Sequence, residues 1–479
     1  MPQRQPGKPS KPSSNAISPA RREAFAILLE LAHREAHADT LLRSPRVSAL
    51  SPQDRNLCTT LVMGTLRWQI RLDSLIKPLL TKPNARLDTE IRIALRLGAL
   101  QLLFLDRIPA HAAIGESVAL AKATGHTFAS GMVNAVLRKL AASAHPEPIS
   151  PSGLSPKELA DATAHPAWLV ERWVKNYGPE ATRAICLHGQ RQPELTIRLN
   201  PVDLQHQEAE LAEQGIVLEP GALLTAARRV LSGDVTSTAA FLSGRIRIQD
   251  EGSQLIAELG GDVTQLPKKI LDCCAAPGGK TLILAEGNPQ AQITAYEISP
   301  ARLEALQART AASAYASQIA VKLADATQLP DSDRYDLVLV DAPCSGTGTL
   351  GRNPEIRHRL QPADLARHHE RQCDLLRSAL NAAAGRVIYS TCSLEPEENS
   401  LVVAEVLAQA SDWRQISVAE VFHKLCEDGR LTPTGGATLK HAEAADGSMT
   451  ILPGSLGPET QTDGFFIAIL EKKTATSLP

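Results

Sequence analysis

The hydrophobic periodicity of this chain changes near residue 245, and this change is the strongest limit on its possible folds. From residue 19 to about 142, apolar residues recur at helical spacing, as in LVMGTLRWQIRLDSLI, without β-alternation. Beyond residue 245, short apolar runs alternate with helical patterns. Such alternation predicts parallel strands joined by crossover helices. We therefore expect a multidomain fold, with an all-α N-terminal domain and a later α/β Rossmann-like domain.

Composition subdivides the 479 residues further. The first 17 residues are rich in Pro, Ser and Lys, so they should form a disordered basic tail. Prolines and serines gathered near residues 141–165 predict a linker. The predicted parts are a tail (1–17), a helical domain (18–145), a linker (146–165), a small α+β connecting domain (166–244) and the Rossmann-like domain (245–475).

Local signals place individual elements. Ser18 before Pro19 reads as a helix start, and Ser51 with Asp54 resembles a second one. The first of these helices should bury one face, formed by Phe25, Leu28, Leu29 and Ala32. In the connecting domain a helix near 166–189 and a strand at 195–201 are expected.

The Rossmann-like region holds five candidate strands. Helical patterns near 302–314 and 361–384 separate some of them. In such a sheet, ligands lie at the carboxyl ends of the strands, where each motif described below also falls. The predicted strands are Lys269–Asp272, Gln292–Ile298, Ala320–Ala324, Tyr335–Asp341 and Gly385–Ser390.

Charge is unevenly distributed along the chain. Residues 1–150 hold 20 Lys and Arg against 11 Asp and Glu, a net of +9, and the remainder carries 30 against 41, a net of -11. A basic first third favours contact with a polyanion, although a solvated helical surface would show the same charge. No apolar run is long enough to cross a bilayer, and the N-terminus does not resemble a secretory signal.

The eight cysteines are scattered and contain no C-x-x-C pair. This argues against a disulfide framework and against a structural zinc site. Free thiols fit a reducing cytoplasm, where they can serve as nucleophiles.

A glycine-rich turn follows the first predicted strand, in LDCCAAPGGKT (271–281). Glycines there allow a ligand to approach the backbone, but a plain strand-to-helix turn would look similar. A P-loop needs glycine five residues before Gly279, and Cys274 occupies that position. No G-x-G-x-x-G is present, which disfavours a nicotinamide or flavin site. Glu297, ending the second strand, could bind a ribose diol, and Asp325, after the third, an adenine amino group.

Two cysteines follow the last two predicted strands. Cys344 lies in YDLVLVDAPCSGTGTLGRNPEIR (335–357) behind Asp341, and Cys392 lies in RVIYSTCSLEPEENS (386–400). The sequence after Cys392 reads as the first turn of a helix, at Pro396–Glu398. A buried structural role is the ordinary one for either thiol taken alone, and Asp341 alone could be a Walker-B-like acid.

Together, the two thiols suit one reaction. Carbon 5 of cytosine is too electron-poor to attack a methyl donor directly. A thiolate that adds to carbon 6 makes carbon 5 nucleophilic, and an acid near N3 assists that addition. Asp341 is placed in the sequence to be that acid.

CCAAPGGKT, DAPCSGTG and STCS, in this order, resemble the RNA cytosine-C5 methyltransferases. DRNLCTTLVMGTLRW (54–68) and GMVNAVLRKL (131–140) resemble a NusB-like RNA-binding domain, and ILPG (451–454) and DGFF (463–466) also fit the bacterial RsmB (Sun, Fmu) type. The similarity covers roughly residues 19–472. It implies that Cys392 attacks carbon 6 and that Cys344 aids product release. Where many relatives have Asp, this chain has Glu297.

The resemblance also implies S-adenosylmethionine as cofactor. The residues implied to hold it are Cys274, Ala275, Ala276, Pro277, Gly278, Gly279, Lys280, Glu297, Asp325 and Asp341. The implied partner is 16S rRNA, naked or within a pre-ribosomal particle. We expect a cytoplasmic monomer that needs neither a metal nor a membrane.

Three alternatives remain. A tRNA cytosine methyltransferase would share the chemistry, although a NusB-like domain favours ribosomal RNA. A non-catalytic RNA-binding factor would not need the two thiols. A nucleotide hydrolase would need the missing Walker A glycine.

Overall fold

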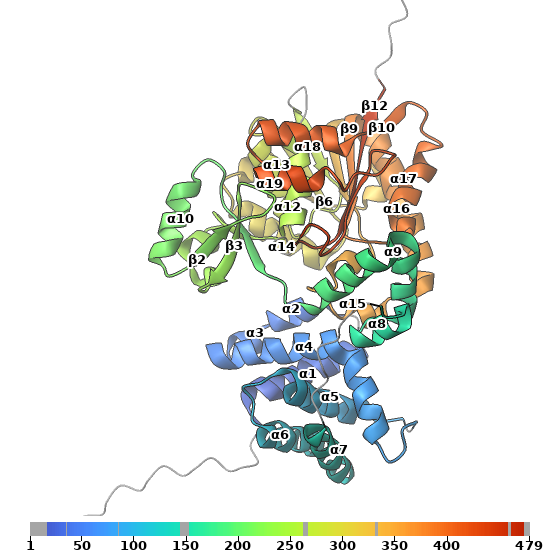
Figure 1. The fold of residues 1–479 in the computed structure, drawn as a ribbon. Coiled ribbons are helices and arrows are strands. Elements are labelled where there is room, and N and C mark those ends of the chain that lie inside the picture. The colour runs from blue at the N-terminus through green and yellow to red at the C-terminus, as the bar shows by residue number, and fades with distance from the viewer. Residues whose placement is uncertain are drawn as a thin grey trace, which may run out of the picture. The chain divides into compact units, whose positions relative to one another are not determined.

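The computed structural model describes residues 17–34, 36–84, 86–143, 153–261, 267–330, 334–457 and 461–473. The chain forms two compact units (Figure 1). The first contains the residues up to Cys186 together with Asn353–His358, and the second contains the rest. The expected tail, except Ile17, and residues 146–152 of the expected linker lie outside the described residues. Within those residues, no helix has the length and apolarity needed to span a membrane.

The first unit is built from helices, which confirms the predicted all-α fold. Ser51 caps the helix after it by accepting a hydrogen bond from the Asp54 backbone at 3.2 Å. Ser18 also precedes a helix, but its hydroxyl bonds Glu116 at 2.7 Å instead of capping. The helices are α1 (Pro19–His33), α2 (Ala38–Leu42), α3 (Pro45–Ser48), α4 (Pro52–Ile76), α5 (Thr89–Phe104), α6 (Ala110–Ala123), α7 (Ser130–Ala142) and α8 (Pro156–Ala162).

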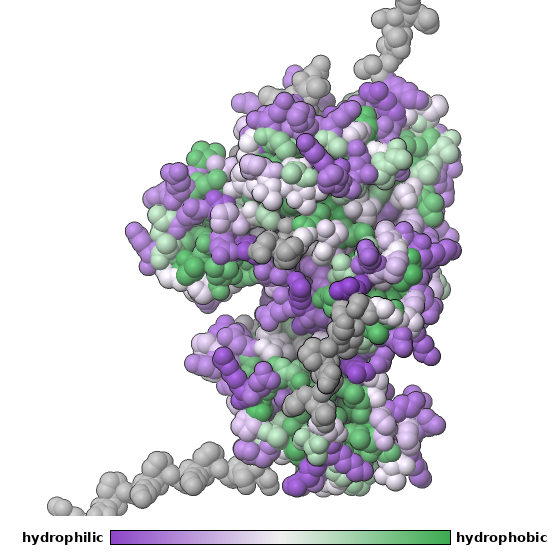
Figure 2. Space-filling view, viewed as in Figure 1, coloured by the Kyte–Doolittle hydropathy of each residue, from purple (hydrophilic) through white to green (hydrophobic). Residues whose placement is uncertain are grey.

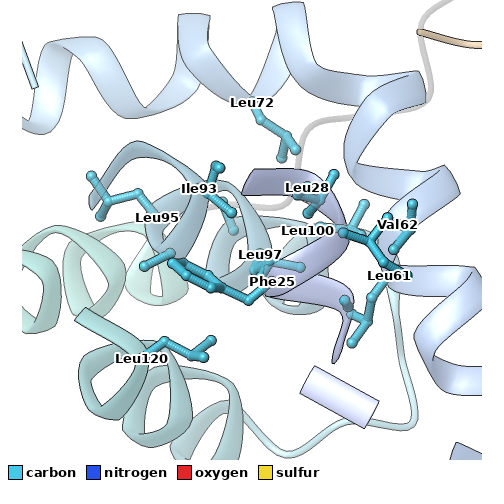
Figure 3. Packing of buried hydrophobic residues seen from close by; sticks show 14 of the residues in the cluster. Phe25, Leu28, Leu61, Val62, Leu72, Ile93, Leu95, Leu97, Leu100 and Leu120 are labelled. Atoms are coloured by element: carbon cyan, nitrogen blue, oxygen red, sulfur yellow. The ribbon is translucent and has the colours of Figure 1, made fainter. Parts of the chain in front are cut away.

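The core of this unit is aliphatic (Figure 3). Leu97 and Leu100 of α5 are each about 1% exposed and pack among leucines of α1 and α4. On α1, Phe25 and Leu28 are buried as predicted, and Leu29 packs at the edge of the core. The prediction for Ala32 was wrong, because the helix turns that residue to solvent and buries Leu31.

A short segment from the later sequence, 353–358, completes the first unit. Glu355 accepts a hydrogen bond from the Ala38 backbone at 3.2 Å. Arg357 donates to the carbonyl of Arg67 at 3.0 Å, and His358 bonds the carbonyl of Leu66 at 2.7 Å. The helical unit therefore includes residues that lie shortly after Cys344 in the sequence.

The connecting region begins with α9 (Ala167–Gln190), which breaks at Gly178, where φ is +80°, just before Pro179. A small antiparallel sheet of order β2-β3-β1-β4 follows, and it places the expected strand at Leu195–Arg198. Figure 2 shows hydrophobic residues at the surface of the part that carries β2 and β3. The elements are β1 (Leu195–Arg198), α10 (Leu204–Glu213), β2 (Val217–Pro220), β3 (Ala227–Ser232), α11 (Ala239–Leu242) and β4 (Arg247–Ile248).

The Rossmann-like domain is confirmed by a sheet of order β10-β12-β9-β8-β5-β6-β7, with β11 paired to β12. The strands β5 to β9 run parallel, and β12 joins β9 antiparallel. All five predicted strands are present, with ends shifted by at most two residues. The strands are β5 (Lys269–Asp272), β6 (Gln292–Glu297), β7 (Ile319–Leu323), β8 (Tyr335–Asp341), β9 (Ala383–Thr391), β10 (Trp413–Ile416), β11 (Met449–Ile451) and β12 (Phe465–Lys472).

Alternate residues of each strand face opposite layers of helices. Leu337 and Leu339 of β8 join a cluster with α12, α13, α18 and α19, whereas Val338 and Val340 join one with α16 and α17. Figure 1 shows these two groups of helices on either side of the sheet. The helices are α12 (Glu251–Glu258), α13 (Gly279–Gly287), α14 (Pro300–Ala311), α16 (Pro362–Ala382), α17 (Ser400–Leu407), α18 (Val418–Glu427) and α19 (Pro433–Leu439). The short helix α15 (Ile356–Arg359) lies mostly in the segment 353–358 of the first unit.

Strand order explains why the sequence motifs meet. The chain leaves β5 for β6 and β7 on one side, then crosses to β8 and β9 on the other. The point between β5 and β8 is therefore a topological switch point, where open α/β sheets bind ligands. The loops after β5, β8 and β9 all begin at this edge.

Candidate active site

The residues 274–280 form the loop after β5 and the first residues of α13, which begins at Gly279. Gly278 adopts φ of +99°, a left-handed conformation that favours glycine. A Cβ at this position would also lie 2.9 Å from Leu306 of α14. The close packing and the positive φ together explain the glycine.

This loop lines a cavity of about 110 Å³. Most of the predicted cofactor residues of the loop border it, together with Asp341 at the end of β8; Gly278 does not. Sequence reasoning missed five of the lining residues, although Asp272 lies within the motif LDCCAAPGGKT that was singled out. The lining residues are Ile248, Gln249, Ser253, Asp272, Cys274, Ala275, Ala276, Pro277, Gly279, Lys280, Arg309 and Asp341.

Glu297 and Asp325 do not line this cavity. Glu297 ends β6, is 2% exposed and accepts a hydrogen bond from the Ser299 backbone at 2.8 Å. Asp325 accepts hydrogen bonds from the backbone and hydroxyl of Thr327 at 3.0 and 2.9 Å. Its carboxylate therefore caps the short 3-10 turn that follows, an engagement that the sequence did not predict.

Buried oxygen atoms without a donor gather around the loop. In the described part of the chain, no group donates a hydrogen bond to Asp272 Oδ1, Gln249 Oε1 or Glu297 Oε2, although Arg302 approaches Glu297 to 3.5 Å. Buried acceptors are ordinarily paired, so these three are suited to hydroxyl or amino donors of a ligand. The acceptor chemistry fits a nucleoside, which carries ribose hydroxyls and an exocyclic amine.

The two cysteines predicted to be catalytic meet. Their Sγ atoms lie 3.4 Å apart, at the ends of the neighbouring strands β8 and β9. The hydrogen bond with Cys392, and then burial, raise the pKa of the Cys344 thiol well above its usual range. The Cys344 thiol is therefore protonated at neutral pH.

Asp341 is fixed by two donors. Its Oδ2 accepts from Lys280 Nζ at 2.8 Å, and its Oδ1 accepts from the Ser390 hydroxyl at 2.9 Å. Burial lowers the pKa of Lys280, but the Asp341 carboxylate and its other acidic neighbours raise it, and the net shift is upward. Lys280 is therefore an ammonium. A Cys392 thiolate would raise the pKa of this lysine further. Both Asp341 oxygens accept hydrogen bonds, so the carboxylate itself holds no proton to donate. If Asp341 has the predicted acid role, the proton must come from Lys280.

A buried carboxylate that the sequence did not single out holds both cysteine loops. Glu398 is fully buried and accepts from the Ser345 backbone at 2.7 Å and from its hydroxyl. It also accepts from the hydroxyl of Ser393, and Gln372 donates to it at 3.2 Å. Because Ser345 follows Cys344 and Ser393 follows Cys392, one carboxylate ties the two thiols to a common support.

The expected helix turn at Pro396–Glu398 is a 3-10 turn, and α17 begins only at Ser400. The predicted helical turn is therefore present, and the backbone of this turn buries Glu398 between the loops. The spacing of two Ser residues, each next to a Cys, was the signal that could have pointed to a shared partner.

The cysteine loops also touch through their backbones. Gly348 donates to the Cys392 carbonyl at 2.9 Å, and its own carbonyl accepts from Gly464 at 2.8 Å. A Cβ on Gly348 would lie 2.4 Å from the Gly464 oxygen. The glycine is needed because three chain segments approach one another at this point.

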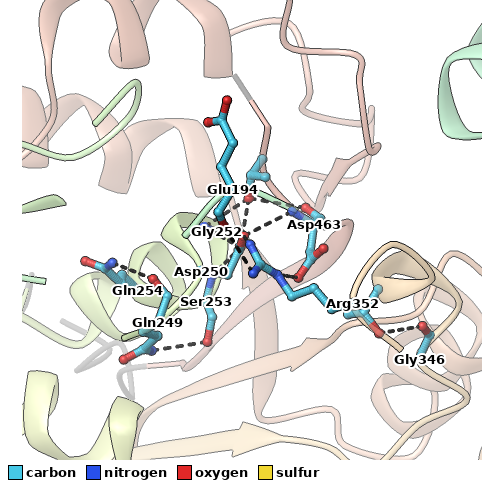
Figure 4. Close-up of polar contacts among 11 residues, drawn as sticks. Glu194, Gln249, Asp250, Gly252, Ser253, Gln254, Gly346, Arg352 and Asp463 are labelled. Carbon is cyan, nitrogen blue, oxygen red and sulfur yellow. Dashed lines mark hydrogen bonds and ion pairs between the residues drawn. The ribbon is translucent and has the colours of Figure 1, made fainter. Parts of the chain in front are cut away.

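Arg352 anchors the far end of the Cys344 loop (Figure 4). It donates to Asp463 at 2.7 Å and to Asp250 at 2.8 Å, and its pKa is raised above the usual range by these two carboxylates against the effect of burial. Asp463 belongs to the DGFF motif. The motif is therefore joined to the cysteine loop by an ion pair.

Comparison with known proteins adds family relationships. Residues 264–471 match the family described as 16S rRNA methyltransferase RsmB/F, residues 18–142 match the NusB family, and residues 165–233 match the ferredoxin-like domain of RsmF/B-like methyltransferases.

Individual relatives span nearly the whole chain. The "Probable ribosomal RNA small subunit methyltransferase B" of Bacillus subtilis (strain 168) is 32% identical over 94% of this chain and 98% of its own length. The protein of the same description from Synechocystis sp. is 34% identical over 95% and 99%. Among solved structures, the crystal structure of PH0851 superposes with a TM-score of 0.76 at 23% identity, covering 97% of this chain and all of that one.

Proposed function

Because this chain belongs to the RsmB/F family of rRNA methyltransferases, we propose that it methylates carbon 5 of a cytosine in 16S rRNA through a covalent bond to Cys392. Family membership supplies the methyl transfer and the class of substrate. The observation that carries the covalent mechanism is the meeting of Cys344 and Cys392, 3.4 Å apart, beside the Lys280–Asp341 pair.

The cofactor of this reaction is S-adenosylmethionine, which when bound supplies an electrophilic methyl group. The loop 274–280 would bind it along the cavity wall, with Asp272 and Gln249 accepting hydrogen bonds from its polar groups. Glu297 Oε2 is the acceptor suited to the ribose. Asp325 could bind the cofactor only by giving up its hydrogen bond to Thr327.

Cys392 acts as the nucleophile. Its thiol would give its proton to solvent, and the thiolate would bond carbon 6, so that carbon 5 becomes nucleophilic. Carbon 5 would then take the methyl group, with S-adenosylhomocysteine as the leaving group. Loss of the carbon-5 proton and cleavage of the sulfur–carbon bond then restore the aromatic base and the free cysteine. Lys280 holds a proton next to Asp341 Oδ2, so this pair can deliver a proton toward N3 as Cys392 attacks.

Cys344 serves the release step. Its thiol keeps its proton and lies against the attacking sulfur, so it is unsuited to compete as a nucleophile. A thiol in that position can exchange protons with the adduct while the bond to Cys392 breaks. The helical domain, residues 18–145, with its basic composition, would supply salt-dependent affinity for RNA.

The test is methyl transfer from labelled S-adenosylmethionine to purified 16S rRNA, 23S rRNA, tRNA and small-subunit precursor particles, read by bisulfite sequencing. Wild-type protein should modify a single 16S cytosine, and Cys392→Ala should abolish transfer while retaining cofactor binding. Cys344→Ala should accumulate a gel-stable RNA adduct. Cys426→Ala is the matched control, because Cys426 is a half-buried thiol on α18.

Each alternative has its own result. Modification of tRNA alone would keep the mechanism and overturn the substrate. Transfer retained in Cys392→Ala would overturn the nucleophile. Cofactor binding without transfer to any of the four substrates would support an RNA-binding factor instead.

A further inference from the structure

Three side chains of the types that bind transition metals gather on the helices α16 and α17, away from the cavity described above. His369 and Cys373 lie one helical turn apart on α16, and Glu405 projects from α17. One nitrogen, one sulfur and one oxygen of these residues all lie within 4.8 Å of one another. In the described ranges of the chain, this is the one such group of three.

Two of the three distances between ligand atoms are close to those of a tetrahedral metal site. Cys373 Sγ lies 3.6 Å from His369 Nε2, and Nε2 lies 2.9 Å from Glu405 Oε2. Ligand bonds of about 2.1 Å to nitrogen and about 2.3 Å to sulfur place two such ligands of tetrahedral zinc roughly 3.6 Å apart. The sulfur and nitrogen already have this separation, and the carboxylate would need to withdraw by only about 0.4 Å.

Both polar ligands are held by partners behind them. His369 Nδ1 bonds the Glu397 carbonyl at 2.6 Å, which turns Nε2 toward the sulfur and the carboxylate. Arg377 donates to the other oxygen of Glu405 at 2.7 Å, which leaves Oε2 facing His369. Partners of this kind are characteristic of metal ligands, because they fix the ligand's orientation.

One ligand of the site is buried and the other two are partly exposed to solvent. Cys373 is 1% exposed, whereas the side chains of His369 and Glu405 are 23% and 45% exposed. An ion can therefore enter past the carboxylate and keep a water molecule as its fourth ligand. A thiolate and a carboxylate bring two negative charges to a divalent cation, and Arg377 shares the charge of the carboxylate through Glu405 Oε1.

We propose that His369, Cys373 and Glu405 bind a thiophilic divalent cation, with Zn²⁺ as the ion that their geometry fits. On binding, Cys373 releases its proton to solvent, and the ion takes the place of the proton shared by His369 and Glu405. The sequence, which lacks a C-x-x-C pair, predicted no metal. The third ligand becomes apparent only when α17 packs against α16.

The role of this site is to fasten two segments that support the cysteine loops. Gln372, next to Cys373, donates to the Pro343 carbonyl at 2.9 Å and to Glu398 at 3.2 Å. The Glu397 carbonyl, which orients His369, directly precedes Glu398. An ion here would tie the backbone around Glu398 to α16 without touching substrate.

The test is zinc binding by the full-length protein after treatment with a chelator, measured by competition with a chromophoric zinc indicator. Wild-type protein should bind one equivalent that Cys373→Ser and His369→Gln both lose. His423→Gln is the matched control, because His423 on α18 also lies near a glutamate, Glu427 at 3.6 Å, and should retain the equivalent. Co²⁺ should give a thiolate charge-transfer absorption that Cys373→Ser abolishes.

The catalytic thiols could also take a thiophilic ion, so the Cys344→Ser/Cys392→Ser double variant is titrated in parallel. It should keep both the zinc equivalent and the cobalt absorption. Loss of the equivalent in the double variant, its retention in His369→Gln, or the absence of any bound equivalent in wild-type protein would overturn the proposal. His369 is partly exposed, so its variant remains informative if Cys373→Ser fails to fold.

Discussion

The helical unit and the cysteine loops are held together in opposite ways. The helical core consists mostly of aliphatic side chains, which are contributed by all of the helices α1 to α7. The loops after β8 and β9 depend on hydrogen bonds that converge on one buried carboxylate, Glu398. The first kind of region distributes its stability over many contacts, and the second concentrates its geometry in a single group.

This difference predicts which substitutions should reduce stability alone and which should also reduce function. An aliphatic core tolerates a change of shape with a loss of stability and little loss of function. A buried carboxylate with several donors cannot be removed without leaving those donors unpaired.

The largest effect is expected for Glu398→Ala. It would release Ser345 and Ser393 together, so the two cysteines would lose their common alignment. Methyl transfer should fall by about 100-fold or more, since misplacement by about 1 Å has that cost, and unfolding free energy should fall by roughly 3 kcal/mol. Single-turnover rates and urea unfolding measure the two effects.

Glu370→Ala is the control, because Glu370 is an exposed acid on α16 and should leave both quantities unchanged. Glu398→Gln should recover part of the rate, since its carbonyl can still accept from one serine. Normal transfer by folded Glu398→Ala would contradict the assigned role of this carboxylate.

The second prediction concerns the helical core. Leu97→Ala would leave a cavity between α5 and its neighbours, at a residue that is 1% exposed. The unfolding free energy should drop by about 2–5 kcal/mol, while methyl transfer per folded molecule stays within about twofold of wild type. Denaturant unfolding and active-site titration provide the measurements. A rate that falls in folded protein would mean that the two regions are not separable.

The contrast between periodic core packing and single long-range contacts also determines which features could be predicted from the sequence. Helical spacing and short apolar runs placed several helices and the five parallel strands β5 to β9, because burial of one face imposes a period on the chain. The strands β10, β11 and β12 of the same sheet were not predicted. Cys344, Cys392 and Asp341 could be located because they follow strands at the ligand-binding edge. These features are local or repeat along the chain.

Contacts between distant segments were not accessible in that way. Glu398 reads as a surface acid behind a proline, and only its burial between two loops makes it a support. Asp325 looked available for a ligand, yet it caps its own turn. The segment 353–358 carries no sign that it packs with helices almost 300 residues earlier. Such pairings depend on tertiary packing and leave no period in the sequence.

Asp272 beside the cysteine loops and His358 in the helical unit should also differ in how their contributions to stability depend on pH. Burial raises the pKa of Asp272 to about 6, against the hydrogen bond from Thr281. Its contribution to stability is therefore present below about pH 4 and lost as the pH rises through 6. Burial, with Arg357 assisting and the Leu66 carbonyl opposing, lowers the pKa of His358 to about 4. Its contribution is present above about pH 6.5 and lost as the pH falls.

The two residues should thus respond with opposite signs between pH 7 and pH 5.5. Relative to Asp272→Asn, wild-type protein should gain about 1 kcal/mol of unfolding free energy on acidification. Relative to His358→Gln, it should lose about 1 kcal/mol over the same interval. Urea unfolding of the three proteins at both pH values gives each difference. Equal signs would show that one of the two burial effects is absent.

The smallest expected effect concerns RNA affinity, where the helical unit should act additively rather than through one group. Lys139 and Lys122 are exposed cations on α7 and α6. If each contacts phosphate, Lys139→Gln should weaken RNA binding by a few-fold and reduce the slope of log affinity against log salt concentration by about one, and the double variant by about two. Filter binding of 16S rRNA across a salt series measures this, with methyl transfer at saturating RNA as the control. If substitution of a single lysine abolished binding, RNA affinity would depend on one residue of the helical unit. The contrast between the two regions would then hold for folding but not for RNA recognition.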